Sequence, residues 1–320
     1  MSAELVIGYQ KIVFIILLIA TGFVLRKKQI FTKELQGGIT NFLFKFIIPI
    51  AIFNSFANSE FDGQKLKESI IIIVISLIFY PAAQLLGKLL YINVKDEKKK
   101  RMLTFATAYA NQTFMGLPFV QAIFGAGGLL AASMFNLPYN IYLWSIGFAT
   151  LTALAMNKDG VKKTFTNPII IACFIGFAWW ILKGSIPVSE MLSTVSTPIK
   201  DVLNTLGGVN TPLSMLIIGA MLAEAKFGAM LSDKLIWYFA FVKLILLPVI
   251  VFAILYMVGF REYVLAIPVT MVAMPTCATG AIICGQYDIH PDFSASIVTF
   301  TTVLSAITIP IWLIVLITIA

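Results

Sequence analysis

Long apolar runs, joined by short polar connections, occupy most of the 320 residues of this chain. A run of about 18 or more residues with few charges is long enough to cross a bilayer as a helix. The runs lack the alternation of polar and apolar residues that a transmembrane barrel requires. We therefore predict an all-α membrane protein. Its ten spans are expected at about residues 6–25, 38–56, 69–90, 102–124, 129–155, 167–183, 208–225, 235–258, 263–285 and 293–318, with a more polar surface helix near 188–205.

The charges of the chain are few and unevenly distributed. Charged residues make up 12% of the sequence, whereas about 25% is typical of soluble domains. The net charge of +8 could indicate nucleic-acid binding in a soluble protein. Here 15 Lys and Arg residues follow the first, third, fifth and seventh spans, and six lie on the other side. Because positive loops favour the cytoplasmic face, we predict a multi-pass protein of the cytoplasmic membrane, with both termini outside and no nucleic-acid partner.

The sequence gives little support for a cleaved leader, a metal site or an enzyme. The first apolar run, 6–25, has no basic leader and no small-residue cleavage site, so we expect it to be retained. The spacing of Cys173, Cys277 and Cys284 fits no metal motif or disulfide framework. The single histidine, His290, is expected in a turn. We predict no enzymatic activity, no metal and no cofactor.

The chain divides into two halves whose helix interruptions match. Pro81 and Pro248 lie within the third and eighth spans, and residues 111–116 of the fourth span align with 275–280 of the ninth. Proline and glycine are common in membrane helices, so one such break would mean little. A matched pair is typical of secondary transporters with inverted repeats. We predict five-span repeats at 1–156 and 167–320, the second one inverted, with a short cytoplasmic connector at 157–166.

The two breaks suggest a site for an anion. A broken membrane helix leaves main-chain groups that only protein, ligand or water can satisfy. Because the fourth and ninth spans enter from opposite sides, their second halves should begin near the midplane and face each other. Each start carries roughly half a positive charge and free N–H donors. Pro118 suits the first turn of one of these second halves.

Candidate substrate-binding residues gather at the breaks and along the fifth span. Polar side chains at the breaks contact the ligand or, alternatively, only cap the half-helices. Asn136 and Asn140 share one helix face, where they line a pathway or bond neighbouring helices. The candidates are Asn54, Asn111, Gln112, Thr113, Gly116, Asn136, Asn140, Pro275, Thr276 and Thr279.

Ionisable residues are scarce inside the spans. A sodium or proton relay usually needs a carboxylate there, and no Asp or Glu lies in the middle of a span. Transport driven by the membrane potential alone is therefore an open alternative. Lys243 lies roughly 12 Å deep in the eighth span, at about 1.5 Å per residue. We expect Lys243 to stabilise the broken region or pair with a carbonyl, and Pro118 and Gly280 to have structural roles.

Several motifs are similar to those of the auxin efflux carrier family, which includes the plant PIN auxin transporters. The segments that carry this resemblance are 273–275 with the turn 287–292, 241–248, 212–219, 167–168 and 111–118. Lys243 stands where arginine is usual, and Phe114 where plant members often have a second asparagine. The similarity runs nearly end to end, but a short connector replaces the long cytoplasmic loop. The chain thus resembles the short prokaryotic form, which includes malate permease-like members.

This resemblance implies two inverted five-helix repeats, with broken helices 4 and 9 crossing at the substrate, as in the bile-acid sodium symporter and NhaA folds. It implies a scaffold part (spans 1, 2, 6 and 7) and a transport part (spans 3–5 and 8–10). Elevator-type alternating access and a homodimer are also implied. Asn111 matches a polar position of the fourth-helix motif, and Pro275 the crossover proline of the ninth.

We therefore predict a secondary transporter for a small organic anion, a carboxylate such as malate or an auxin-like acid. One alternative is a sodium-coupled organic anion symporter of the bile-acid type, although the lack of mid-span carboxylates argues against it. The other is a membrane sensor that binds its ligand without moving it. A sodium requirement would favour the first alternative, and binding without passage the second.

Overall fold

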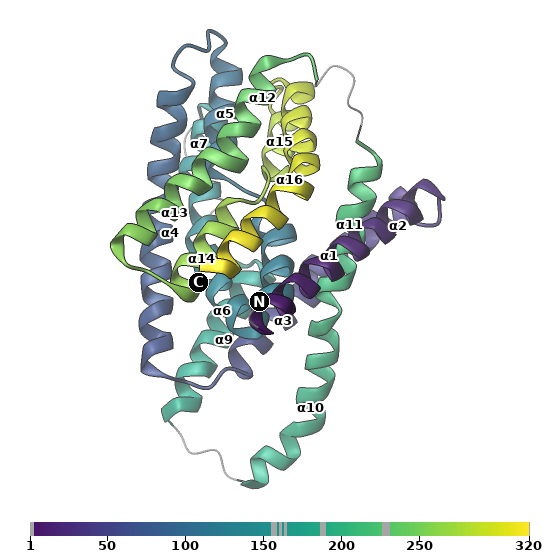
Figure 1. The fold of residues 1–320 in the computed structure, drawn as a ribbon, viewed down its shortest axis with the longest axis vertical. Helices are drawn as coiled ribbons and strands as arrows, with labels where there is room; N and C mark the ends of the chain where they lie inside the picture. The colour runs from purple at the N-terminus through teal and green to yellow at the C-terminus, as the bar shows by residue number, and fades with distance from the viewer. Residues whose placement is uncertain are drawn as a thin grey trace.

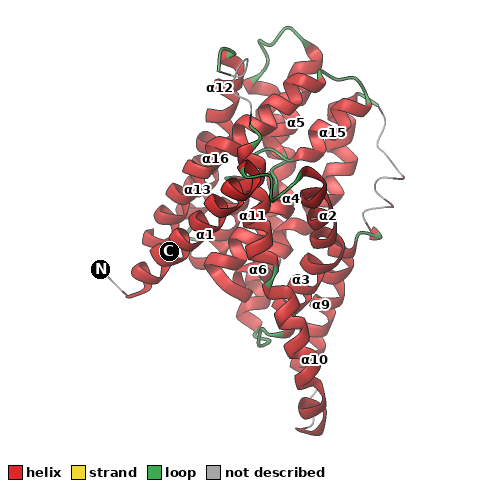
Figure 2. Cartoon of the chain, turned by 90° about the vertical axis from the view of Figure 1, so that its right-hand side faces the viewer, coloured by secondary structure: helices red, strands yellow, loops and turns green. Residues whose placement is uncertain are grey.

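The computed structural model describes residues 3–154, 159, 162, 165–185, 190–225 and 231–319. Within these residues every regular element is a helix, and Figure 2 shows helices and loops without strands. The fold class predicted from the sequence, an all-helical membrane protein, is confirmed. Lys158, Lys163 and Lys226, which contribute to the predicted charge bias, lie outside the described residues, as does much of the predicted connector.

Figure 1 shows the α-helices coloured in chain order, and short π-helical turns (η) lie between several of them. The first half contains α1 (Ala3–Lys27), α2 (Lys33–Phe42), η1 (Leu43–Ile47), α3 (Ile48–Ala57), α4 (Gly63–Leu90), α5 (Glu97–Ala108), η2 (Gln112–Gly116), α6 (Leu117–Tyr142), η3 (Leu143–Gly147) and α7 (Phe148–Thr152). The second half contains α9 (Pro168–Ser185), α10 (Glu190–Gly208), α11 (Asn210–Ala223), α12 (Lys234–Phe241), η5 (Val242–Leu246), α13 (Leu247–Val258), α14 (Glu262–Val272), α15 (Ala278–Gln286) and α16 (Pro291–Ile319).

Seven helical stretches of the described residues are long and apolar enough to cross a membrane: Val6–Lys27, Lys33–Ala57, Gly63–Leu90, Gln112–Thr152, Pro198–Ala223, Lys234–Val258 and Pro291–Ile319. The other predicted spans are not continuous helices of that length. Residues 109–111 divide the fourth and 273–277 the ninth, and the sixth is the shorter apolar helix Pro168–Gly184. Within α6, Gly125 has a φ of 68° and separates the fourth and fifth predicted spans. The arrangement of ten spans stays a prediction.

Prolines account for three of the π-helical turns. Pro49, Pro118 and Pro248 each lie two residues after such a turn. Proline lacks an N–H, and its ring displaces the carbonyl four residues earlier, so the preceding turn widens. At Pro248 the displaced carbonyl, that of Leu244, accepts a hydrogen bond of 3.0 Å from the indole N–H of Trp312. The eighth predicted span therefore continues through its proline without an orphaned acceptor.

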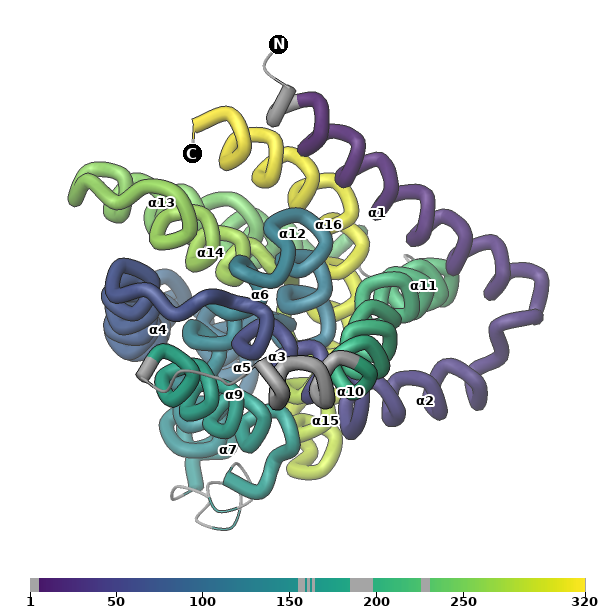
Figure 3. The backbone as a smooth tube through the Cα atoms, turned by 90° about the horizontal axis from the view of Figure 1, so that it is seen from below, coloured from purple at the N-terminus to yellow at the C-terminus, as the bar shows by residue number. Residues whose placement is uncertain are grey.

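The helices form two groups around a buried centre. Helix α1 packs against α11, and α3 packs against α9 and α10. Figure 3 shows α1, α2 and α11 along one side, with α4, α13 and α14 along the opposite side.

The predicted surface helix near 188–205 is helical from Glu190, but it extends to Gly208 and leads into α11, so it is longer than expected. Residues 188 and 189 lie outside the described residues.

Candidate functional site

The two predicted breaks meet in space. Ala110 and Thr276 form an isolated antiparallel bridge between the unwound segments of the fourth and ninth predicted spans. The N–H of Asn111 donates to the Pro275 carbonyl at 2.6 Å, and the N–H of Cys277 donates to the Tyr109 carbonyl at 3.1 Å. Main-chain groups freed by each break are thus satisfied by the other break, as apolar surroundings require. We refer to this pairing as the crossover.

A half-helix begins on either side of the crossover, and no side chain caps either one. One starts at Gln112 after Asn111, and the other is α15, which starts at Ala278 after Cys277; neither preceding residue makes a side-chain cap hydrogen bond. The first N–H groups of a helix have no partner within it, and they carry partial positive charge. The sequence left open whether Asn111 serves only as a cap, and its geometry does not support that reading.

A cavity of about 520 Å³ adjoins both helix starts. Its wall contains residues from the crossover, from the middle of the fifth predicted span and from the connector. The lining residues are Phe44, Asn111, Thr113, Phe114, Tyr139, Asn140, Leu143, Trp144, Asp159, Asn167, Cys277, Ala278, Thr279, Ile282 and Gln286. Four of the predicted site residues, Asn111, Thr113, Asn140 and Thr279, therefore lie around one cavity. No Lys or Arg among the described residues lines it.

The side-chain amide of Asn111 lines this cavity and forms no hydrogen bond with the described residues, although its main chain is bonded at the crossover. The residue is 8% exposed, and the Thr279 side chain in the same wall is likewise unbonded among the described residues. The Asn140 amide, by contrast, donates to the Asn136 carbonyl at 3.0 Å. Asn136 is buried behind the wall, where its Nδ2 approaches the Thr113 hydroxyl at 3.4 Å. Asn136 therefore positions Thr113 and Asn140 and does not line the cavity itself.

Two other predicted site residues, Gln112 and Thr276, do not line this cavity. Gln112 is fully buried; its Oε1 accepts from the Tyr80 hydroxyl at 2.8 Å, and its Nε2 lies 3.5 Å from the Met271 carbonyl. Thr276 is also fully buried, and its main-chain N–H donates to the Thr301 hydroxyl at 3.3 Å. Neither residue lines the cavity described above: Gln112 bonds packed protein, and the Thr276 hydroxyl is buried without a hydrogen-bond partner among the described residues. A substrate role for either residue stays a prediction.

Two glycines permit the close approach of the crossing helices. A Cβ on Gly116 would lie 2.8 Å from Met271 Sδ, and one on Gly280 would lie 2.5 Å from the Phe105 ring. Pro275 contributes its main-chain carbonyl to the crossover. Pro118 lies in the first turn of α6, but the half-helix already begins with the π-helical turn at Gln112. The proline therefore lies beyond the first turn of the half-helix, where the sequence had predicted it.

Asn54 lies elsewhere. Its Nδ2 donates to the Leu203 carbonyl of α10 at 2.5 Å, and it lines a separate cavity of about 120 Å³. Asn54 therefore does not adjoin the cavity beside Asn111, because α3 turns this side chain toward α10, and a substrate role for it stays a prediction.

Lys243 has the structural role that the sequence suggested. It is fully buried, and its Nζ donates to the Thr107 carbonyl at 3.0 Å. Thr107 lies in the last turn of α5, immediately before the break. The amino group thereby satisfies one of the carbonyls that the end of a helix leaves without a partner.

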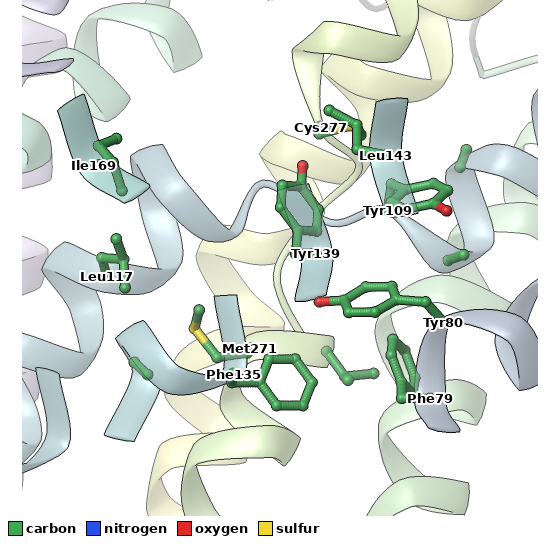
Figure 4. Packing of buried hydrophobic residues seen from close by; sticks show 14 of the residues in the cluster. Phe79, Tyr80, Tyr109, Leu117, Phe135, Tyr139, Leu143, Ile169, Met271 and Cys277 are labelled. Atoms are coloured by element: carbon green, nitrogen blue, oxygen red, sulfur yellow. The ribbon is translucent and has the colours of Figure 1, made fainter. Parts of the chain in front are cut away.

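Sequence reasoning missed the aromatic wall of the cavity. The rings of Phe44 and Phe114 are stacked with centroids 5.2 Å apart. Tyr139 and Trp144 belong to the same wall, and Figure 4 shows the Tyr139 hydroxyl pointing toward Cys277, with Tyr80 and Tyr109 close by. A signal was available, since Tyr139 precedes Asn140 and Trp144 follows it by one helical turn.

Comparison with known proteins gives two matches. A family model described as "Membrane transport protein" matches residues 7–313. An "Uncharacterized transporter" of Methanothermobacter thermautotrophicus is 23% identical over 316 residues, which cover 96% of this chain and 98% of that protein. Both matches extend through the crossover and the cavity.

Proposed function

Because the chain belongs to the auxin efflux carrier family of membrane transport proteins, we propose that it is a secondary transporter for a small organic anion with one carboxylate. Membership of this family is also consistent with a protein that is not an enzyme. The observation that carries the proposal is the side-chain amide of Asn111. It lies unbonded, in a cavity wall, beside two uncapped half-helix starts.

The chemistry of this position suits a carboxylate. Two helix N-termini supply partial positive charge and N–H donors, and the Asn111 amide and the Thr113 and Thr279 hydroxyls supply further donors. Lysine and arginine are not needed, so the substrate is held without a strong ion pair. Binding of that kind is weak enough for release, which a transporter requires.

The remaining wall favours an apolar body over a second carboxylate. Phe44, Phe114 and Trp144 offer ring faces, whereas a dicarboxylate would bring its second charge to a wall without a cation. Asp159, the acidic residue of the lining, would repel that charge. An auxin-like monocarboxylate therefore fits the cavity better than malate does.

We propose ten spanning helices in two inverted five-helix repeats, 1–156 and 167–320, with an NhaA-like or bile-acid symporter-like plan. The antiparallel bridge between the fourth and ninth spans supports an inverted relationship. The scaffold part would comprise α1–α3 and α9–α11, and the transport part α4–α7 and α12–α16. In this proposal the transport part carries the substrate past the scaffold, in a homodimer of the cytoplasmic membrane with both termini outside.

Counterflow uptake in proteoliposomes tests the proposal. Labelled monocarboxylates and dicarboxylates are supplied with and without sodium and a pH gradient. We expect uptake of a monocarboxylate without a sodium requirement, reduced at least tenfold in Asn111→Ala. Asn41→Ala, at an exposed position of α2, is the matched control and should transport normally.

Three results would contradict the proposal. Uptake that requires sodium would favour a symporter of the bile-acid type. Binding of an acid without uptake would favour a sensor. Equal uptake by Asn111→Ala and Asn41→Ala would remove Asn111 from the site.

A further inference from the structure

The half-helix that leads away from the crossover is bonded to the neighbouring helices at its far end. Asn210 Nδ2 donates to Gln121 Oε1 at 2.7 Å, and Gln121 Nε2 lies 3.4 Å from the Gly207 carbonyl. The Thr211 hydroxyl lies 3.4 Å from the Pro118 carbonyl, and Lys11 Nζ donates to the Ile123 carbonyl at 2.6 Å. All four interactions join the scaffold part to residues 118–123 of the transport part.

These interactions lie on the opposite side of the crossover from the substrate cavity. Asn111 and Gln121 are separated by ten residues, or roughly 15 Å along a helix. Gln121 lines the smaller cavity of about 120 Å³ that also contains Asn54 and Ser55. This smaller cavity shares Asn58 and Ala126 with a polar cavity of about 380 Å³ lined by Glu60, Lys65 and Tyr263. The two adjoining cavities thus extend from the loops before α4 and α14 toward Gln121.

The two ends of the half-helix meet the scaffold differently. At the cavity end the scaffold contacts are apolar: the rings of Phe44 and Phe114 stack, and Met115 packs in one apolar cluster with Ile12 and Met215. At the far end, main-chain and side-chain hydrogen bonds fix the position of the half-helix. Lys11 bonds the Ile123 carbonyl, which lies near the end of that half-helix at Gly125 and would otherwise lack a partner, and Asn210 bonds the side chain of Gln121.

We propose that Lys11, Asn210 and Thr211, together with Gln121, form a latch. The closed latch blocks the end of the transport pathway at the small cavity beside Gln121, and it holds the transporter in the state that is open at the substrate cavity. The proposal rests on the proposed transport function, because a transport part that slides past the scaffold must break all of these bonds. Opening of the latch would join the small cavity around Ser55 to the polar space beyond it. The hydrogen bonds of Gln121 thereby determine the equilibrium between the state open at the substrate cavity and the state open at the small cavity.

Reaction of a cysteine at position 55 with a maleimide measures latch opening directly. Ser55 is buried and lines the small cavity, and Ser55→Cys is nearly isosteric. The purified protein is labelled in detergent, and peptide mass spectrometry separates position 55 from Cys173, Cys277 and Cys284. Gln121→Leu in this background should raise the labelling rate roughly fivefold, the factor by which one neutral hydrogen bond typically shifts an equilibrium. Gln64→Leu, at an exposed position of α4, should leave the rate unchanged.

Lys11→Met provides a second variant should Gln121→Leu fail to fold, since methionine has a similar shape and suits a membrane helix. It should also raise the labelling rate. Folded Gln121→Leu or Lys11→Met protein that labels at the rate of the Gln64→Leu control would overturn the latch. Labelling needs no substrate, so absent uptake with increased labelling would contradict the substrate assignment and leave the latch standing. Normal uptake with unchanged labelling would contradict the latch alone.

Discussion

The main-chain N–H of Asn111 donates to the carbonyl of Pro275 at 2.6 Å, which links the fourth and ninth predicted spans at their breaks. This bond fixes the main chain of Asn111 while its side chain stays unbonded at the cavity wall. The crossover therefore provides a rigid support for a free amide group, which is what a binding residue requires.

A negative charge at position 111 should abolish anion binding. Asn111→Asp keeps the size of the side chain but places a carboxylate beside both half-helix starts, where it would take the place of the substrate. We expect uptake to fall at least as far as in Asn111→Ala, with the elution profile and melting temperature retained. Substrate uptake and binding isotherms measure the effect. Transport at the normal rate by Asn111→Asp would place the anion elsewhere.

Loss of the Lys243 amino group should destabilise the protein. Lys243→Met leaves the buried Thr107 carbonyl without its partner, and an unsatisfied buried acceptor costs about 1–3 kcal/mol. Thermal unfolding in detergent should show a lower melting temperature. Lys45→Met makes the same substitution at an exposed position of another π-helical turn and should have little effect. Equal melting temperatures for the two variants would argue against the capping role of Lys243.

The close contact between α15 and α5 should not tolerate an added methyl group. Gly280→Ala places a Cβ at 2.5 Å from the Phe105 ring, and overpacking of this kind typically costs about 1–3 kcal/mol. In the same helix, a Cβ on Gly285 meets nothing within 4 Å, so Gly285→Ala is the matched control. Melting temperatures should fall for Gly280→Ala only. A stable Gly280→Ala variant would show that the two helices pack less tightly.

Asp96 should make the stability of the loop before α5 depend on pH. Its carboxylate accepts from the N–H groups of Lys98 and Lys99 at 3.0 and 3.1 Å and pairs with His290 Nε2 at 2.8 Å. The main-chain bond from Lys99, together with His290, holds the pKa of Asp96 below its ordinary value. A carboxylate with a lowered folded-state pKa stabilises the protein above its unfolded pKa of about 3.9, and that stability is lost as the pH falls through the folded value.

Melting temperatures of the natural protein and Asp96→Ala, measured between pH 7 and pH 3, test this dependence. The difference should correspond to about 1 kcal/mol at pH 7, as for other N-cap losses, and should shrink below about pH 4. Asp233→Ala removes an N-cap that bonds Leu235 and has no histidine partner, so its effect should be smaller. A difference for Asp96→Ala that stays constant down to pH 3 would contradict the assignment.

The sequence predicted the broken helices better than the contacts of the side chains beside them. Proline, glycine and polar residues predicted breaks at 111–116 and 275–280. The structure has the non-helical residues slightly earlier, at 109–111 and 273–277, and brings these segments together. Gln112 and Thr113 are adjacent in the sequence and equally polar, yet Gln112 bonds Tyr80 and Thr113 lines the cavity. Periodicity could not separate them, because the π-helical turn there changes the direction of each side chain from that in an α-helix.

The amino-acid sequence by itself determined that the chain is helical, lies in a membrane and has two interrupted helices, because apolar length and helix-breaking residues act locally. Only the tertiary structure decided which polar groups remain free. Asn54, Asn111 and Asn136 are the same residue type in apolar runs, but α10 bonds the first, Thr113 contacts the third, and the second faces the cavity. That outcome depends on the partner each side chain finds across the fold, and residues distant in sequence supply those partners.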